Sequence, residues 1–454
     1  MIQSARQVLA EVASAGYCIH PVQLHGTTVD VETGELEHSI LRVPCKDRRA
    51  AVCPSCSYLY KADAWILIAA GMLGGKGLSA EVKSHPRVFV TLTAPSFGAV
   101  HRVTKSGSCH PGSRAATCVH GVTRTCRASH ADDDVLLGAP LCADCFDYVE
   151  AVLWNATASR LWHRTMVRLR QGVGATQHLS EAELHKVARI NYLKVAEFQR
   201  RGLVHFHAVI RADGPEGAES APPEWLTTEV LEHQVRRLAL TAVYKGAERR
   251  GFQWGTQLEI SDITAGEDDG RRIAGYLAKY AVKSTDDSAT FARRFRRRID
   301  IERMPARDHA RQLALTAWDL GEDLELEALG LRRHAHAFGF TGQLITKSQG
   351  FSTTFLALRG ARTAHMTASN EGASMVLGSY AYAGRGYTDP RGEAVAELLH
   401  TETVAMRQRA KERRVGALQV LGSSRNDSRV GSRTGSQGSR IGSQADRKRE
   451  ADPQ

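Results

Sequence analysis

The sequence has no long apolar run and no recognisable export signal. Among its 454 residues, no apolar stretch approaches the roughly 20 residues that a membrane-spanning helix needs, and the run from Ala64 to Leu73 is too short and contains Gly71. The first residues, Met1 to Arg6, lack the basic end and long apolar core of a secretory signal. We therefore expect a cytoplasmic protein without a membrane partner.

A phosphate-binding loop of the kind found in nucleotide-driven motors is also missing. The run from Gly74 to Gly77 is rich in glycine and contains Lys76, but it lacks the Gly-x-x-x-x-Gly-Lys-Ser/Thr spacing, and neither Ser nor Thr follows the lysine. We interpret this run as a flexible turn. The sequence therefore predicts no motor domain of its own.

Cysteine is absent after Cys145, so all nine cysteines lie in the first third of the chain. In a reducing compartment such cysteines are more often metal ligands than disulfide partners. Cys53 and Cys56 form a Cys-x-x-Cys pair, in which two thiolates can bind one ion, and Cys18 and Cys45 can complete a four-sulfur site. The alternative is a set of small buried residues with free thiols.

A second Cys-x-x-Cys pair, Cys142 and Cys145, ends a polar, cysteine-rich segment. This pair predicts a second structural zinc site, with Cys118 and Cys126 as the other two ligands. Three alternative ligands stay open, because sequence alone does not fix connectivity: Cys109, His120 and His130. Such a module can bind duplex DNA, or it can only stabilise a loop.

A histidine pair lies in the most informative stretch, from Arg201 to Ile210. Apolar residues occupy every second position there, which predicts a strand with one buried face. The alternation places His205 and His207 together on the other face. The residues from Leu193 to Phe198 predict the partner strand, and Gly202 permits the positive φ of a tight turn.

Glu197 adds a carboxylate to this pair. If the hairpin is centred near Arg201, Glu197 lies opposite His205 and points the same way. An isolated His-x-His pair is more often two half-buried histidines, so the carboxylate across the turn is what favours a metal site. Two imidazoles and a carboxylate suit a divalent cation that keeps open positions for substrate oxygens.

A tyrosine pair follows on a predicted helix from Ile273 to Lys283. Tyr276 and Tyr280 are four residues apart and share one helix face, and Lys279 and Lys283 each follow a tyrosine by three positions. An aromatic pair at this spacing is usually core packing. Phenols beside ammonium groups instead indicate a nucleophile held at a phosphate.

Taken in order, these blocks resemble the HUH endonuclease superfamily of rolling-circle replication initiators. Its first motif, a strand ending in Thr-Leu-Thr, matches Val88 to Thr93, and the His-x-His strand and the tyrosine helix follow in the family's order. The tyrosine pair resembles the two-tyrosine initiators. The broader similarity, which extends to Thr346–Ser348 and Tyr380–Gly384, is to initiators of actinobacterial plasmids and integrative conjugative elements.

The resemblance implies an α+β fold with an antiparallel sheet of about five strands and helices on one side, into which the zinc module is inserted. The expected divisions of the chain are residues 1–86 with the first cysteine group, 87–290 as the endonuclease domain with an insertion at about 101–150, a mostly helical region at 291–420, and a disordered Ser/Gly/Arg tail at 421–454. Apolar periodicity predicts strands at 87–93 and 256–260, and helices at 5–14, 61–72, 146–170, 225–249, 309–331 and 393–414. In the third of these helices, Trp154 and Trp162 are expected to pack in the core.

The resemblance also implies the chemistry. In the expected reaction, Mg²⁺ or Mn²⁺ on His205, His207 and Glu197 assists attack by Tyr276 or Tyr280, while Lys279 or Lys283 favours the phenolate or neutralises the phosphate. The products are a 5′-phosphotyrosine and a free 3′-hydroxyl, from which rolling-circle DNA replication starts. The expected partners are origin DNA, a host helicase and the host replication machinery, and the oligomeric state stays open.

Two other functions fit the same residues. A two-tyrosine transposase has the same chemistry and an upstream zinc module, and a zinc-ribbon DNA-binding regulator would do no chemistry. A formal charge of +11 and a pI near 9.3 suit a polyanionic partner in all three cases. The densest basic run is either a solvated helix face or, beside a DNA-cleaving site, a set of phosphate contacts, and its members are the candidate DNA-binding residues: Arg293, Arg294, Arg296, Arg297 and Arg298.

Overall fold

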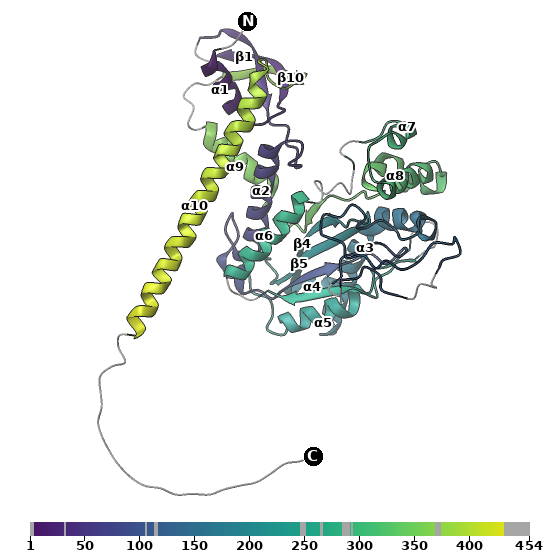
Figure 1. The fold of residues 1–454 in the computed structure, drawn as a ribbon. Helices are drawn as coiled ribbons and strands as arrows, with labels where there is room; N and C mark the ends of the chain where they lie inside the picture. The colour runs from purple at the N-terminus through teal and green to yellow at the C-terminus, as the bar shows by residue number, and fades with distance from the viewer. Residues whose placement is uncertain are drawn as a thin grey trace, which may run out of the picture.

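The centre of the molecule is a five-stranded antiparallel sheet in the order β8-β3-β5-β4-β9 (Figure 1). Its strands are β3 (Arg87–Leu92), β4 (Arg189–Phe198), β5 (Val204–Asp213), β8 (Leu258–Asp262) and β9 (Ile345–Lys347). These features belong to a computed structural model, which describes residues 4–30, 33–104, 107–112, 117–245, 251–263, 267–283, 291, 294–367 and 374–430. The predicted strands at 87–93 and 256–260 correspond to β3 and β8.

The β4–β5 hairpin has the register that the sequence predicts. Glu197 pairs with His205, which centres the hairpin on Arg201. Gly202 lies in the turn with φ of 77°, and a Cβ there would come within 2.2 Å of the Leu313 side chain. The turn therefore requires glycine for both its backbone conformation and its close packing.

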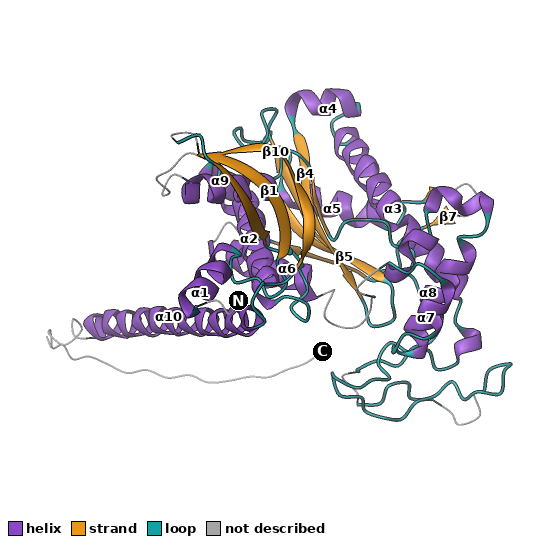
Figure 2. Cartoon of the chain, turned by 90° about the horizontal axis from the view of Figure 1, so that it is seen from above, coloured by secondary structure: helices purple, strands orange, loops and turns teal. Residues whose placement is uncertain are grey.

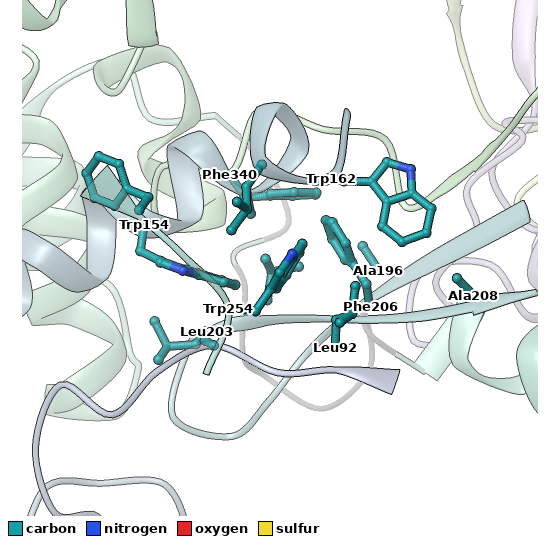
Figure 3. Packing of buried hydrophobic residues seen from close by; sticks show 14 of the residues in the cluster. Leu92, Trp154, Trp162, Ala196, Leu203, Phe206, Ala208, Trp254 and Phe340 are labelled. Carbon is teal, nitrogen blue, oxygen red and sulfur yellow. The ribbon is translucent and has the colours of Figure 1, made fainter. Parts of the chain in front are cut away.

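One face of the sheet packs against α3 (Tyr148–Ala175) and α5 (Thr228–Ala239). Even-numbered residues of β5 supply this face, and Phe206 and Ala208 are fully buried in it. Figure 3 shows Phe206 and Ala208 on the strand side of this cluster. Trp154 and Trp162 are 1% and 2% exposed, so the prediction that they pack in the core is confirmed.

The opposite face packs against α2 (Pro54–Leu73) and α6 (Glu267–Lys283) (Figure 1). Leu193, Val195 and Val209 of the sheet meet Leu277 and other apolar residues of these helices there. The expectation of helices on one side only is therefore wrong. The reason is that the odd-numbered face also carries apolar side chains away from the histidines, and these must be covered.

Two buried arginines fix α2 to the sheet. Arg211 on β5 donates through Nη1 to the carbonyl oxygen of Gly71, and Arg87 on β3 donates to that of Met72 at 2.5 Å. Both carbonyls lie in the last turn of α2, where they have no helical partner. Asp213 accepts from Nε and Nη2 of Arg211 at 2.7 Å each, so the guanidinium charge is paired in the core.

A second sheet, in the order β10-β1-β2, pairs a strand from the C-terminal part of the chain with two strands from the N-terminal part (Figure 2). Its strands are β1 (Val22–Asp30), β2 (Leu36–Val43) and β10 (Ser374–Arg385). From the sequence alone Gly26 indicates a weak turn, but it lies within β1, where it pairs with Ser39 of β2. Arg42 of β2 forms an ion pair with Glu11 at 2.5 Å, which ties this sheet to the first helix.

The remaining helices are α1 (Ala5–Ser14), α4 (Glu181–Val187), α7 (Arg298–Glu302), α8 (Asp308–Leu320), α9 (Phe355–Thr367) and α10 (Arg391–Val430). The predicted helices at 225–249 and 309–331 are shorter than expected, as α5 and α8 show. The long helix α10 extends ten residues into the predicted tail, and residues 431–454 lie outside the described part of the chain. Within the described residues, no helix is long and apolar enough to cross a membrane.

The Arg211 anchor generates a stability prediction. Arg211→Met removes the cation that pairs with the buried Asp213 carboxylate and the donor to the Gly71 carbonyl of α2, so we expect a loss of about 3–5 kcal/mol in the free energy of unfolding, measured in urea. Arg236→Met is the matched control because Arg236 pairs with Glu232 at the surface, and it should cost less than about 1 kcal/mol. Equal losses in the two variants would contradict the anchoring role.

A second prediction concerns Lys194, which is 3% exposed, with its ammonium group 4.0 Å from the centroid of the Phe206 ring. Burial lowers the pKa of Lys194 from 10.5 to about 7. Between these values the unfolded chain binds the extra proton, so this group's contribution to stability rises with pH and is lowest below pH 7.

Lys194→Met should therefore raise the free energy of unfolding at pH 6 by an amount on the order of a few kcal/mol, and by much less near pH 10. Lys186→Met, at an exposed position on α4, serves as the control and should change little at either pH. A gain in Lys194→Met that does not vary with pH would refute the titration of this lysine.

Candidate metal and tyrosine site

The predicted metal triad forms on the odd-numbered face of the hairpin. His205 Nε2 and His207 Nε2 lie 3.1 Å apart, and Glu197 Oε2 lies 3.1 Å from His207 Nε2. All three ligand atoms fall within 4.8 Å of one another. The donor set of two imidazole nitrogens and one carboxylate oxygen fits a divalent cation with open coordination positions.

A threonine from the β3 side of the sheet lies next to the Nδ1 atom of each histidine ring. Thr91 Oγ1 lies 3.1 Å from His207 Nδ1, and Thr93 Oγ1 lies 3.3 Å from His205 Nδ1. With Nδ1–H donated to the threonine, each Nε2 keeps its lone pair for a metal. The Thr-Leu-Thr motif is visible in the sequence, but only the structure shows that its two threonines lie beside the histidine rings.

The environment of His205 favours the neutral imidazole. Burial, followed by the proximity of His207 and Arg201, lowers the pKa of His205 to about 3. A neutral ring is the form that binds a metal, so the ligand needs no deprotonation near neutral pH.

Helix α6 places both tyrosines against His207. The ring centroids of Tyr276 and Tyr280 lie 5.4 Å and 4.8 Å from that of His207, and 4.5 Å from each other. The Phe89 ring lies between the strand and the helix, stacked on His207 and edge-on to Tyr276. The helix face and the hairpin face that the sequence predicts separately therefore meet at one place.

The two tyrosines differ in exposure and in their neighbours. Tyr276 is 41% exposed, whereas Tyr280 is half-buried. Burial, then the hydrogen bond with the Tyr280 hydroxyl, raises the pKa of Tyr276 above its usual value. Lys279 is exposed on the same helix, and the side chain of Lys283 lies outside the described residues.

Glu259 on β8 is a neighbour that the sequence did not reveal. It pairs in register with Thr91, which in turn pairs with His207, so all three lie on one face of the sheet. Its negative charge contributes to the raised pKa of Tyr276. Only the strand order β8-β3-β5 could have identified it.

The first cysteine group forms a compact cluster at the start of α2. The four sulfur atoms of Cys18, Cys45, Cys53 and Cys56 lie within 4.8 Å of one another. Cys53 is the N-cap residue of α2, and the backbone N–H of Cys45 donates to the Cys18 sulfur at 3.2 Å. This donor set fits zinc, which would join the N-terminal segment to the helix that supports α6.

The second predicted cysteine set is wrong in one position. Cys118, Cys142 and Cys145 come together as predicted, but the fourth member of this cluster is His120, whose Nδ1 lies 3.3 Å from the Cys145 sulfur. Cys126 lies instead beside His130, in a different cluster. The physical reason is that the chain reverses between Cys118 and Cys126, so that His120 faces the Cys-x-x-Cys pair.

The basic run lies at the start of α7. Arg294, Arg296, Arg297 and Arg298 are exposed, and Arg293 lies outside the described residues. Arg298 forms ion pairs with Glu302 and Asp319, and Arg297 pairs with Asp300 at 2.9 Å. Carboxylates therefore offset part of the positive charge of this run.

Two comparisons with known proteins agree with each other. The model of a family described as "Replication initiator protein, pSAM2" matches residues 4–401. A curated replication initiator protein from Streptomyces ambofaciens is 37% identical to the chain over 436 residues, which cover 88% of this chain and 91% of the relative. No solved structure matches the chain.

The ring contacts of Thr91 generate a testable prediction. Thr91→Val keeps the shape of the side chain but removes the partner of His207 Nδ1, so we expect Mn²⁺ to bind about 10–100-fold more weakly, measured by electron paramagnetic resonance on zinc-loaded protein. The control Thr241→Val, at the exposed end of α5, should leave Mn²⁺ affinity unchanged. Unaltered affinity in Thr91→Val would remove the orienting role.

Proposed function

The chain belongs to the family of replication initiator proteins described for pSAM2, and we propose that it initiates replication by cutting one strand of origin DNA with Tyr276 or Tyr280. The observation that carries this proposal is the contact of both tyrosine rings with His207, one member of the Glu197–His205–His207 triad. The proposed nucleophiles thus lie beside the proposed metal ligands, as strand cleavage requires.

The proposed reaction exchanges one phosphodiester bond for another. The tyrosine oxygen attacks phosphorus and forms a bond to it, and the bond from phosphorus to the 3′ oxygen breaks. The phosphate therefore stays on the 5′ end of the cut strand, now linked to the tyrosine. The phenol proton leaves to a base or to water, and the departing 3′ oxygen takes up a proton. The 3′-hydroxyl is then free to prime a polymerase, while the 5′ end stays on the protein.

The side chains at this site have different roles in the proposed reaction. A divalent cation on the triad would hold a non-bridging phosphate oxygen and offset the charge that develops on it. Since burial and the hydrogen bond with Tyr280 raise the pKa of Tyr276, ionisation of its phenol depends on positive charge nearby. Lys279, three residues after Tyr276 on α6, is the proposed side chain that neutralises the phosphate or favours the phenolate.

Two tyrosines allow the reaction to be repeated. Because phosphotyrosine keeps the energy of the cleaved bond, the second tyrosine can cut a regenerated site and the free ends can be rejoined. The centroids of the two rings are 4.5 Å apart, which supports the proposal that both hydroxyls act at one phosphate position in turn. We propose Tyr276 as the first nucleophile because it fills the motif position and is the more exposed of the two.

DNA reaches the tyrosines as a single strand in the proposed reaction, so the origin must first be melted or extruded. The exposed arginines from Arg294 to Arg298 are proposed contacts to phosphates. A host helicase is the proposed source of continued strand separation, since the sequence carries no phosphate-binding loop motif.

A transposase and a non-enzymatic regulator remain the competing functions. Family membership favours an initiator over a transposase, which would share the chemistry but would move the ends that flank its own gene. A regulator would bind duplex DNA and form no covalent product. The chemistry of the tyrosines therefore decides between initiator and regulator.

The test is incubation of the protein with single-stranded segments of its own replicon and Mn²⁺ or Mg²⁺, followed by a denaturing gel. We expect a covalent protein–DNA adduct that disappears with EDTA or in His207→Ala. Tyr276→Phe should reduce it or shift it to Tyr280, and the double variant Tyr276→Phe/Tyr280→Phe should form none, because no phenol remains beside the triad.

Tyr382→Phe is the control, since Tyr382 is 68% exposed on β10 in the other sheet. Its adduct should equal that of the unchanged protein. A full adduct in the double variant would exclude these tyrosines as nucleophiles. Absence of any adduct from the unchanged protein, together with tight binding of duplex DNA, would favour the regulator.

A further inference from the structure

A further cluster of metal-ligating side chains lies in the cysteine-rich segment. His101, Cys109, Cys126 and His130 each offer one ligand atom, and these atoms lie within 4.8 Å of one another. We propose that these four residues bind a zinc ion of their own, distinct from the ion of the Cys118–His120–Cys142–Cys145 cluster. The segment would then hold two zinc ions where the sequence predicts one.

The spacing of the ligand atoms matches tetrahedral coordination. His101 Nδ1 lies 3.1 Å from His130 Nε2, Cys126 Sγ lies 3.5 Å from His130 Nε2, and Cys109 Sγ lies 3.8 Å from His101 Nδ1. Atoms bound at about 2.0–2.3 Å to a tetrahedral zinc ion lie roughly 3.3–3.8 Å from one another. The cluster therefore has the size of a zinc site before any ion is added.

The outer nitrogen of His130 has the partner typical of a zinc ligand. Asp134 Oδ2 accepts a hydrogen bond from His130 Nδ1 at 2.6 Å, so Nε2 is left as the metal-binding nitrogen and points into the cluster. A carboxylate behind a ligating imidazole fixes its tautomer and makes it a stronger ligand. His130 is 6% exposed and Cys109 is 1% exposed, so little water can reach their ligand atoms. A bound metal ion would offset the cost of burying these polar groups.

The ligands of the two clusters alternate along the chain. In order, the pairs are His101 and Cys109, then Cys118 and His120, then Cys126 and His130, then Cys142 and Cys145; the first and third belong to one cluster, and the second and fourth to the other. Each ion would therefore close a loop that contains ligands of the other. The two sites form an interleaved module and not two independent fingers.

Two bound ions would stabilise the segment between β3 and α3, where regular secondary structure is scarce among the described residues. Between β3 and α3, the described residues hold only the short 3-10 turn Ala143–Cys145 and isolated bridges such as His110 with Cys126. A segment with so little regular structure and so few buried apolar side chains gains its stability from metal ligation.

The proposed zinc site also connects to the hairpin that carries His205. The backbone oxygen of Asp134 accepts from Arg200 Nη1 at 3.4 Å, and Gly138 lies so close that a Cβ there would be 2.3 Å from the Arg200 carbonyl carbon. A cleft of about 760 Å³ separates the two parts, and His101 and Arg200 both line it. The ion would thus hold one wall of a cleft next to the hairpin turn.

The experiment is a count of zinc per chain by elemental analysis of full-length protein. It is done on the His207→Ala variant, so that the Glu197–His205–His207 triad contributes no bound metal and the count does not depend on the proposed reaction. We expect three zinc ions per chain, one for each cysteine-containing cluster. Cys126→Ala should lower the count by one or, if the interleaved sites fail together, by two, and Cys126→His should restore it.

His110→Ala is the matched control within the segment, because His110 Nε2 binds the backbone oxygen of Val100 and lies outside both clusters. It should keep three ions. Two zinc ions in the parent protein, or an unchanged count in Cys126→Ala, would overturn the proposal. Cobalt substitution gives a second measurement, since Cys126→His should retain tetrahedral bands with weaker thiolate charge transfer than its parent.

Discussion

The strict alternation of side chains along β5 is the constraint on which the rest of the structure depends. Its even-numbered residues enter the core under α3, which fixes the strand in place. Its odd-numbered residues then face α6, with His205 and His207 near the turn and Arg211 near the far end, where it holds α2. A shift of one residue in register would move His205 and His207 into the core under α3 and turn the apolar residues toward α6. The positions of the histidine pair and of the Arg211 anchor are therefore set by the same strand pairing.

Helix α2 supports α6, the helix that carries the tyrosines, and so links their position to the sheet. Its C-terminal carbonyls are held by Arg87 and Arg211, and its N-terminus begins at Cys53 within the four-cysteine cluster. Since α6 packs on α2 and on β4, the position of Tyr276 depends on a helix that is fixed at both ends. The Cys/His clusters of the segment between β3 and α3 lie near the hairpin turn and so near the strand that carries His205. Metal ions bound there and at the four-cysteine cluster would stabilise two parts of the described chain that bury few apolar side chains.

The local parts of the site were predictable from the sequence, because strand and helix periodicity determine which residues share a face. The pairing of Glu197 with His205 and the shared face of the tyrosines need nothing beyond a turn at Gly202 and a spacing of four. What depends on distant parts of the chain was not predictable. Sequence alone did not fix the ligand connectivity, so Cys126 was predicted in place of His120 in the second cluster, and only the fold shows that ligand pairs alternate. Strands β1 and β10, more than 300 residues apart, likewise pair without any local signal.

The central claim is that Glu197, His205 and His207 bind a divalent cation directly beside Tyr276 and Tyr280. The most direct measurement is diffraction from crystals soaked in Mn²⁺, recorded where manganese scatters anomalously. The account predicts an anomalous peak within bonding distance of both Nε2 atoms and the carboxylate, on the side that faces the phenols. Peaks confined to the cysteine clusters, or a triad whose side chains point away from α6, would contradict it.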